Sequence, residues 1–321
     1  MQYFSNNNNK FSKICLGTWS LSGKKSNIKS YEKLNEKKIY SILEKALEKK
    51  INFFDTASVY GLSEQYLGNF INKIRDKVII ASKVGCESFE KKLNFRKKNI
   101  NNQIEKIKKN LKSDYIDIIQ LYNPNPKDKY LMSALELLEK LRAKNVVGSI
   151  GVTLNRPEDY VKLRKLYKFK FIQCNFNFLD QRLIDYKILN LVKKDKSTIF
   201  ARTVLNFGIF TEAFLNKNRI SFSANDHRSK WNKYQIYRWI EFAKKVKSLS
   251  NRNLETTSYK FVNSYNIDGM IIGATEKLHI EQACKKKNFL KLSNKEKNKI
   301  NKIYSLYNES LIKKPFYKIK S

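Results

Sequence analysis

The sequence predicts a single-domain α/β protein of 321 residues, folded as a closed (β/α)8 TIM barrel. Eight short apolar segments alternate with amphipathic helical segments from one end of the chain to the other. Most of the short segments are continuously apolar, which is typical of strands buried on both faces of a parallel sheet. No linker-like stretch divides the chain, and about 250 residues suffice for one barrel of this kind. We therefore treat residues 1–321 as one domain.

The expected strands leave room for a helix between most successive pairs. They comprise residues 13–19, 51–57, 78–84, 115–122, 146–153, 171–178, 197–203 and 268–274. A doubly wound open sheet is the alternative, but no GxGxxG pattern follows the first expected strand. The nearest candidate phosphate loop has Gly17 and Gly23 six residues apart, one more than that pattern requires.

Helices are expected where apolar residues recur at spacings of three and four. Four such faces stand out: Ile39, Ile42, Leu43, Ala46 and Leu47; Leu131, Leu135, Leu138 and Leu141; Val161, Leu163, Leu166 and Tyr167; and Ile236, Ile240, Ala243 and Val246.

Three segments lie outside the strand–helix repeat. Residues 1–11 precede the first strand and are expected to form a hairpin that closes the barrel floor. Residues 204–230 form a long connection after the seventh strand, and the polar cluster SANDHRSKW begins within it. Long loops in compact domains commonly cover or build binding sites. Residues 288–321 are expected to hold a terminal helix, roughly 293–308, and a basic tail.

The sequence contains 65 Lys and Arg but only 29 Asp and Glu, which gives a net charge of +36. Such a charge is typical of proteins that bind nucleic acids. However, the lysines are spread over every expected helix instead of being concentrated with arginine and aromatic residues on one face. We interpret them as solvated helix surfaces and expect no nucleic-acid partner.

Membrane and metal chemistry are not expected either. No apolar run approaches the length of about 18 residues that a membrane helix needs, and the first residues lack an apolar signal core. The four cysteines are far apart in the sequence, and we interpret them as small buried apolar residues in a reducing compartment. We therefore expect a cytoplasmic protein. With only two histidines, His227 and His279, and no HExxH motif, no metal site is expected.

Catalytic residues of such a barrel lie where strands run into the following loops. Asp55 and Lys83 end two apolar strands, where an isolated charge would be costly, and these strands are neighbours in a barrel. We therefore expect the two residues to pair, with Tyr60 within reach five residues after Asp55. A phenol beside a buried ammonium has a lowered pKa, which suits a general acid. A purely structural ion pair beside an ordinary loop tyrosine is the alternative.

Seven segments of the chain resemble the aldo-keto reductase superfamily, in order and with one motif for nearly every strand. They are LGTWSLSG (16–23), FFDTASVYGLSEQYLGNFI (53–71), IIASKVG (79–85), YIDIIQLYNPNP (115–126), SIGVTLN (149–155), FIQCNFNFLDQR (171–182) and MIIGATEKLHIEQA (270–283). The resemblance implies reduction of an aldehyde or ketone to an alcohol, or the reverse, with hydride from NAD(P)H. By this resemblance Tyr60 donates the proton, Lys83 tunes it and Asp55 orients Lys83.

The resemblance also implies a cofactor site. Thr153 stands where the family has a carboxamide-binding Ser, Leu154 where an Asn usually follows, and Arg202 where a Tyr or Arg stacks under the nicotinamide. Lys277 is the local cation for a 2′-phosphate, so NADP is favoured, with NAD not excluded. The full set of cofactor residues implied is Gly17, Thr18, Trp19, Thr153, Gln173, Arg202, Gly273, Ala274, Thr275, Lys277 and His279.

One departure from the family concerns catalysis directly. The family places a His at the end of the fourth strand, where this chain reads Gln-Leu-Tyr-Asn-Pro with Tyr122 in that position. A phenol can also donate a hydrogen bond, so we expect Tyr122 to complete the site. The alternative is a cofactor-binding barrel with weak or lost catalysis that serves as a regulatory or partner subunit.

Overall fold

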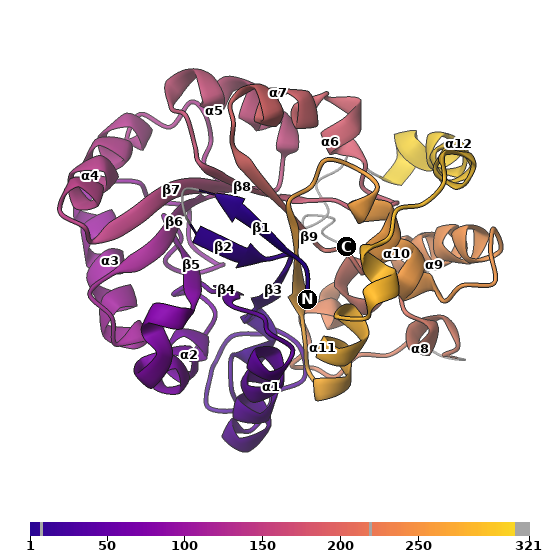
Figure 1. The fold of residues 1–321 in the computed structure, drawn as a ribbon, viewed down its shortest axis with the longest axis horizontal. Helices are drawn as coiled ribbons and strands as arrows, with labels where there is room; N and C mark the ends of the chain where they lie inside the picture. Colours follow the sequence, from indigo (N-terminus) through magenta and orange to yellow (C-terminus); the bar gives the residue numbers. More distant parts are fainter. Residues whose placement is uncertain (7–8, 218–219, 312–321) are drawn as a thin grey trace.

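Eight parallel strands close into a barrel, which confirms the predicted fold class. The computed structural model of the chain describes residues 1–6, 9–217 and 220–311. Around the barrel the strands follow one another in sequence order, and the last pairs with the first (Figure 1). They are β3 (Ile14–Gly17), β4 (Phe53–Asp55), β5 (Ile79–Val84), β6 (Ile116–Tyr122), β7 (Val147–Leu154), β8 (Phe171–Asn175), β9 (Thr198–Arg202) and β10 (Gly269–Gly273).

Helices surround the ring of strands (Figure 1). Several begin where the sequence supplies a capping asparagine: Asn35, Asn232 and Asn253 each accept a hydrogen bond from a backbone N–H in the first turn. The helices are α1 (Glu36–Glu48), α2 (Ser63–Ile71), α3 (Lys97–Leu111), α4 (Leu131–Ala143), α5 (Tyr160–Leu166), α6 (Arg182–Asp185), α7 (Ile188–Lys194), α8 (Glu212–Leu215), α9 (Lys233–Lys247), α10 (Leu254–Asn263), α11 (Lys277–Ala283) and α12 (Asn294–Leu311).

Three of the four expected helix faces are buried in the core, and the face expected over residues 161–167 was wrong in part, since only Leu163 and Tyr167 of its four residues contact the core. Val161 and Leu166 are exposed, at 40% and 39%, whereas Tyr160 and Leu163 are buried. The hydroxyl of Tyr160 donates to Asp195 (2.8 Å), so an aromatic residue with a polar end fills the place that the pattern gave to aliphatic residues.

An antiparallel hairpin of β1 (Tyr3–Asn6) and β2 (Asn9–Ser12) lies across the end of the barrel (Figure 1). Phe11, only 2% exposed, places its ring 5.4 Å from both Phe53 and Phe171. Phe4 stacks on Phe11 at 5.0 Å and also approaches Phe200. These five rings form an aromatic floor beneath the interior of the barrel.

Of the two remaining segments, the connection after β9 carries only short helical turns, whereas the C-terminal segment holds the expected terminal helix as α12. Between β9 and α9, the described residues form the short α8 and two 3-10 turns, Asn206–Gly208 and His227–Lys230. At the other end of the chain α12 packs beside α9, where the Tyr307 hydroxyl donates to Glu241 (2.7 Å). The expected basic tail beyond Leu311 lies outside the described residues.

Within the described ranges, no helix is long and apolar enough to cross a membrane. All four cysteines are free thiols, and three of them, Cys15, Cys86 and Cys174, are buried.

The aromatic floor gives a stability prediction. Phe11→Ala should lower the free energy of unfolding by about 3–5 kcal/mol, because it removes a buried ring and leaves a cavity between the hairpin and the barrel. Urea unfolding followed by circular dichroism measures the change. Tyr234→Ala, at a position 72% exposed, is the control and should leave stability nearly unchanged. A loss below about 1 kcal/mol for Phe11→Ala would show that the hairpin contributes little to the fold.

Candidate active site

Polar side chains converge at the carboxyl ends of the strands. Asp55 ends β4, and Lys83 lies one residue before the end of β5. Lys83 is in register with Gln120 of β6, and Gln173 lies on β8. Because parallel strands in a barrel all point the same way, these residues meet at one end of it.

The Asp55 carboxylate is the centre of this group. Its Oδ2 accepts from Lys83 Nζ at 2.7 Å, and its Oδ1 accepts from Gln173 Nε2 at 2.9 Å and Gln120 Nε2 at 3.2 Å. The Lys83 ammonium also donates to the Thr56 carbonyl at 2.7 Å. Asp55 and Lys83 are only 4% and 2% exposed. Each buried charge is therefore compensated by its partner and by further hydrogen bonds.

Tyr60 lies beside this pair, in the turn between β4 and α2. Its backbone N–H donates to the Ala57 carbonyl (2.9 Å), and the following Gly61 has a φ of +66°, where a side chain would also clash with Ser26. The Tyr60 residue is 8% exposed, and Lys83 Nζ lies 4.9 Å from the centre of its ring. The predicted group of Asp55, Tyr60 and Lys83 is thus brought together by the fold.

Tyr122 belongs to the same wall of the site. It packs against the small cluster that contains Tyr60 and Cys86. Burial raises the pKa of the Tyr122 phenol above its ordinary value, and Tyr60 raises it further. Burial also raises the pKa of the Cys86 thiol to about 11. At neutral pH both groups therefore carry their protons.

Several buried polar atoms at this end of the barrel lack partners within the part of the chain that the structure describes. They are the hydroxyls of Thr18 and Thr153, the indole Nε1 of Trp19 and the Oδ1 of Asn123. Such atoms are costly when left unpaired. Donors and acceptors grouped at strand ends in this way fit a bound ligand that carries amide, hydroxyl or phosphate groups.

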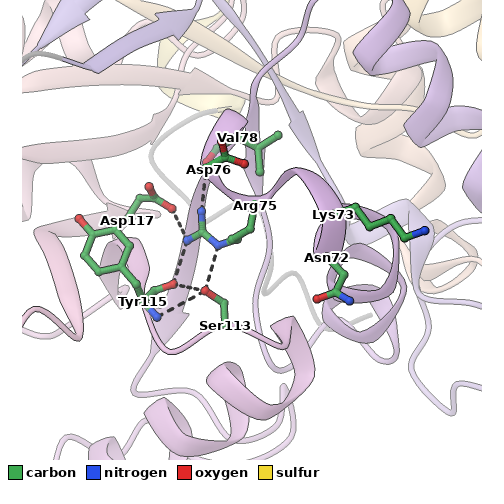
Figure 2. A pocket seen from close by; sticks show the side chains of 8 residues that line it. All are labelled: Asn72, Lys73, Arg75, Asp76, Val78, Ser113, Tyr115 and Asp117. Atoms are coloured by element: carbon green, nitrogen blue, oxygen red, sulfur yellow. Dashed lines mark hydrogen bonds and ion pairs between the residues drawn. The ribbon is translucent and has the colours of Figure 1, made fainter.

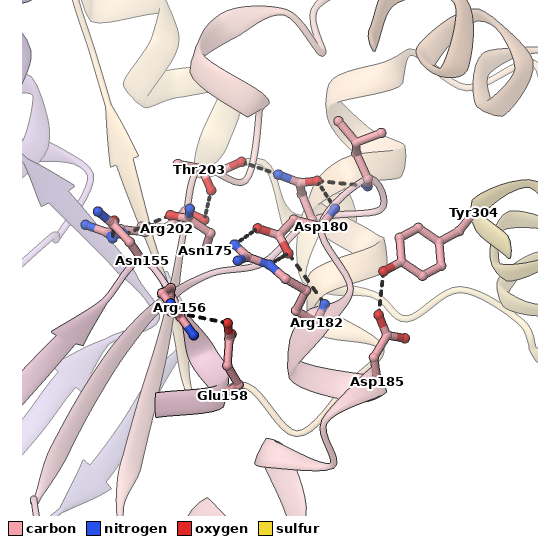
Figure 3. Close-up of polar contacts among 12 residues, drawn as sticks. Asn155, Arg156, Glu158, Asn175, Asp180, Arg182, Asp185, Arg202, Thr203 and Tyr304 are labelled. Carbon is pink, nitrogen blue, oxygen red and sulfur yellow. Dashed lines mark hydrogen bonds and ion pairs between the residues drawn. The ribbon is translucent and has the colours of Figure 1, made fainter. Parts of the chain in front are cut away.

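Arg202, at the end of β9, is held by two amide side chains. Its Nε donates to Asn175 Oδ1 at 2.8 Å, and its Nη2 donates to Asn155 (Figure 3). Two amides on one guanidinium fix the orientation of its plane, as stacking under a ring requires.

The remaining predicted cofactor residues lie at the junction of β3 and β10. Gly273 is in register with Gly17, and the carbonyl of Ala274 accepts from Ser20 Oγ at 2.7 Å. The N–H of Thr275 donates to His279 Nδ1 at 3.2 Å, which closes the turn into α11. Lys277 begins that helix and is exposed.

Three residues of the site had no role in the sequence prediction: Gln120, Asn155 and Asn206. Gln120 interrupts the apolar run of residues 118–121 on β6, and this polar residue between apolar neighbours was the available signal. Asn155 follows the end of β7, where the structure places it against Arg202, while Leu154 packs in the core. Asn206 has a φ of +42° and is buried with both side-chain amide atoms unpaired among the described residues.

A second polar hollow lies at the opposite end of the barrel (Figure 2). It surrounds Arg75, near the starts of β5 and β6. The Arg75 guanidinium donates to Asp117 (2.6 Å), to Ser113 Oγ (3.0 Å) and to the Val78 carbonyl (3.1 Å). These bonds tie helix to strands, so we interpret the hollow as structural.

In the described ranges, no group of three or more His, Cys, Asp or Glu residues is arranged to hold a metal ion.

Comparison with known proteins gives matches over most of the chain. The family model for the Aldo/keto reductase family matches residues 13–305. An uncharacterized oxidoreductase, YqkF of Bacillus subtilis, is 29% identical over 201 residues, which are 60% of this chain. The match spans 64% of that relative's own length, just under two thirds. The aldo-keto reductase YhdN of the same organism is 29% identical over 245 residues, covering 74% of this chain and 71% of the relative.

Among solved structures, the holo form of aldo-keto reductase AKR11C1 from Bacillus halodurans superposes with a TM-score of 0.78. The alignment covers 99% of this chain and all of that chain, at 19% sequence identity. At this level of identity the likeness supports the fold.

The buried ion pair gives a prediction on stability. Lys83→Met should lower the free energy of unfolding by about 3–5 kcal/mol, because Asp55 would keep a buried charge without its cation. Adding Asp55→Asn should restore much of the loss, since the asparagine carries no charge. Chemical unfolding of wild type, single and double variants measures both effects. Equal stability of Lys83→Met and wild type would show that water already compensates the carboxylate.

Proposed function

The chain belongs to the aldo/keto reductase family, and on this premise we propose that it reduces an aldehyde or ketone to an alcohol, or catalyses the reverse. The observation that carries the proposal is the buried pair of Lys83 and Asp55 beside Tyr60. A buried charge pair is costly to maintain, so its presence beside a phenol argues for a working site over a retired one. The proposed cofactor is NADPH, with NADH as the alternative.

Each member of the group has a distinct role in the proposed reaction. A reduced nicotinamide supplies the hydride when bound. Tyr60 donates its hydroxyl proton to the carbonyl oxygen of the substrate. The Lys83 ammonium, 4.9 Å from the centre of the Tyr60 ring, stabilises the negative charge that the phenol then carries. Asp55 holds the ammonium in place through a 2.7 Å hydrogen bond.

Tyr122 completes the proposed site as a hydrogen-bond donor to the substrate carbonyl. Its raised pKa keeps the phenol protonated, as a donor must be. A phenol also occupies more volume than the imidazole usual in the family, and this favours slender carbonyl substrates over bulky ring ketones.

Residues at the strand ends would hold the cofactor. The Thr153 hydroxyl, which has no partner among the described residues, suits the nicotinamide carboxamide. Gln173 uses its Nε2 on Asp55, which leaves its carbonyl oxygen for the same carboxamide. The fixed plane of Arg202 suits stacking against the nicotinamide ring.

The phosphate and adenosine end of the cofactor would lie at the first and last strands of the barrel. Thr18 would contribute its hydroxyl there, which has no partner among the described residues. The residues proposed for this end are Gly17, Thr18, Gly273, Ala274, Thr275, Lys277 and His279. Trp19, whose ring lies 6.3 Å from that of Tyr60, is proposed to contact the cofactor on the nicotinamide side. Lys277, exposed at the start of α11, is the proposed partner of a 2′-phosphate and the reason that NADP is favoured.

Tyr60→Phe tests the proposed proton donor. Turnover of aldehydes with NADPH should fall by about a hundredfold or more, because the variant keeps the ring and loses only the acid. The Kd for NADPH, measured by fluorescence titration, should be unchanged. Tyr234→Phe makes the same substitution at an exposed position and should match wild type. Wild-type turnover in Tyr60→Phe, on a substrate whose chemistry is rate-limiting, would mean that another group supplies the proton.

Tyr122→Phe and Tyr122→His test the departure from the family. Tyr122→Phe should lower kcat by roughly tenfold to a hundredfold, the effect of one lost donor in the transition state. Steady-state kinetics on the best substrate of an aldehyde, ketone and sugar screen measures this. Unchanged kinetics in Tyr122→Phe would reduce Tyr122 to a space-filling residue, and a gain of activity in Tyr122→His would indicate a weakened natural site.

A further inference from the structure

The segment after β9 places His227 against the loop that follows β3. The His227 backbone N–H donates to the Ser30 carbonyl at 2.7 Å, and Asp226 forms a parallel β-bridge with Ser30. Arg228 then ties the segment down, with Nη2 on Asp226 Oδ2 at 2.6 Å and Nη1 on the Phe207 carbonyl at 2.9 Å. The imidazole is therefore held by a fixed backbone.

Aromatic rings surround this imidazole. Its centre lies 4.5 Å from that of Trp19, 4.9 Å from Tyr31, 5.1 Å from Trp231 and 5.7 Å from Phe207. Trp19 and Tyr31 come from the connection after β3, and Phe207 and Trp231 come from the connection after β9. His227 is thus the polar member of an aromatic cluster.

The cluster continues to the proposed proton donor. The ring of Trp19 lies 6.3 Å from that of Tyr60, and Phe89 lies 6.2 Å from Trp19 and 6.5 Å from Tyr60. Rings therefore follow one another from Tyr60 through Trp19 to His227. A substrate whose carbonyl meets Tyr60 has aromatic surfaces along the rest of its length, and these favour a flat, unsaturated molecule.

His227 brings an unused polar atom to this wall. Its Nε2 is buried and has no hydrogen-bond partner among the described residues. Burial lowers the pKa of the imidazole to about 3, so the ring is neutral at physiological pH. A neutral imidazole nitrogen is a single hydrogen-bonding group without charge, and leaving it buried and unpaired is costly. Nothing in the proposed reduction uses it.

We propose that His227 is a specificity-determining residue for flat aromatic aldehydes. It binds a neutral hydroxyl group at the end of the substrate opposite the carbonyl. The inference rests on the proposed function and extends it to the substrate class. Trp19 and Phe89 supply the apolar surfaces for the substrate ring, and the hydroxyl group pairs with Nε2 of His227.

Two aldehydes of nearly equal size test this pairing. 4-(Hydroxymethyl)benzaldehyde and 4-ethylbenzaldehyde differ by one hydroxyl group in place of a methyl group. The corresponding 3-substituted isomers direct the substituent from the ring at a different angle toward His227. Wild type should reduce the better hydroxymethyl isomer with a kcat/KM about tenfold above that of its ethyl counterpart. His227→Phe keeps a ring against Trp19 but removes Nε2, so the ratio should fall to about one.

His227→Gln is the companion variant, because it restores a polar group and should recover part of the preference. It also provides a second readout if His227→Phe folds poorly, as judged by circular dichroism. The role of His227 is overturned if the ratio of the two kcat/KM values is near one in wild type, or if it is undiminished in both variants. Either result leaves the proposed reductase activity intact. Failure of wild type to reduce any aldehyde with either NADPH or NADH overturns the proposed function itself and this inference with it.

Discussion

The ion pair between Lys83 and Asp55 links the fold to the chemistry. A carboxylate and an ammonium almost without solvent are stable only when their remaining hydrogen-bonding capacity is used. Here the amides of Gln120 and Gln173 and the carbonyl of Thr56 supply it, from β6, β8 and the end of β4. Closure of the barrel is what brings these strand ends together, so the charge pair depends on the fold and the site depends on the charge pair.

The same arrangement connects the proposed proton donor to the proposed cofactor site. Gln173 donates to Asp55, while its strand neighbour Thr153 leaves a hydroxyl unpaired among the described residues. A ligand that draws on the Gln173 carbonyl would therefore act on a side chain that already orients the carboxylate. In the proposed reaction, cofactor binding and proton transfer would share Gln173, so a change at this residue would affect both.

The sequence predicted what depends on local pattern and on the cost of buried charge. Continuous apolar runs located all eight barrel strands, and the cost of isolated charge paired Asp55 with Lys83. Contacts between separate strands were not predictable in the same way: Asn155 follows β7 and accepts from Arg202 at the end of β9, although β8 lies between the two strands. The face of α5 was missed because the burial of Tyr160 depends on Asp195, 35 residues later. The rings around His227 come from two connections that lie far apart in the sequence, those after β3 and β9, and no spacing in the sequence reveals such a cluster.

The aromatic floor determines from which side water and solutes enter the barrel. Because Phe11 and the rings around it fill the barrel on the hairpin side, the interior is a cup with one rim, and not a tube. Among the described residues these rings close the hairpin side, so water and solutes reach Asp55 from the opposite rim. A ligand bound at that rim, or the segment that carries His227, therefore determines how much water reaches the buried pair of Asp55 and Lys83.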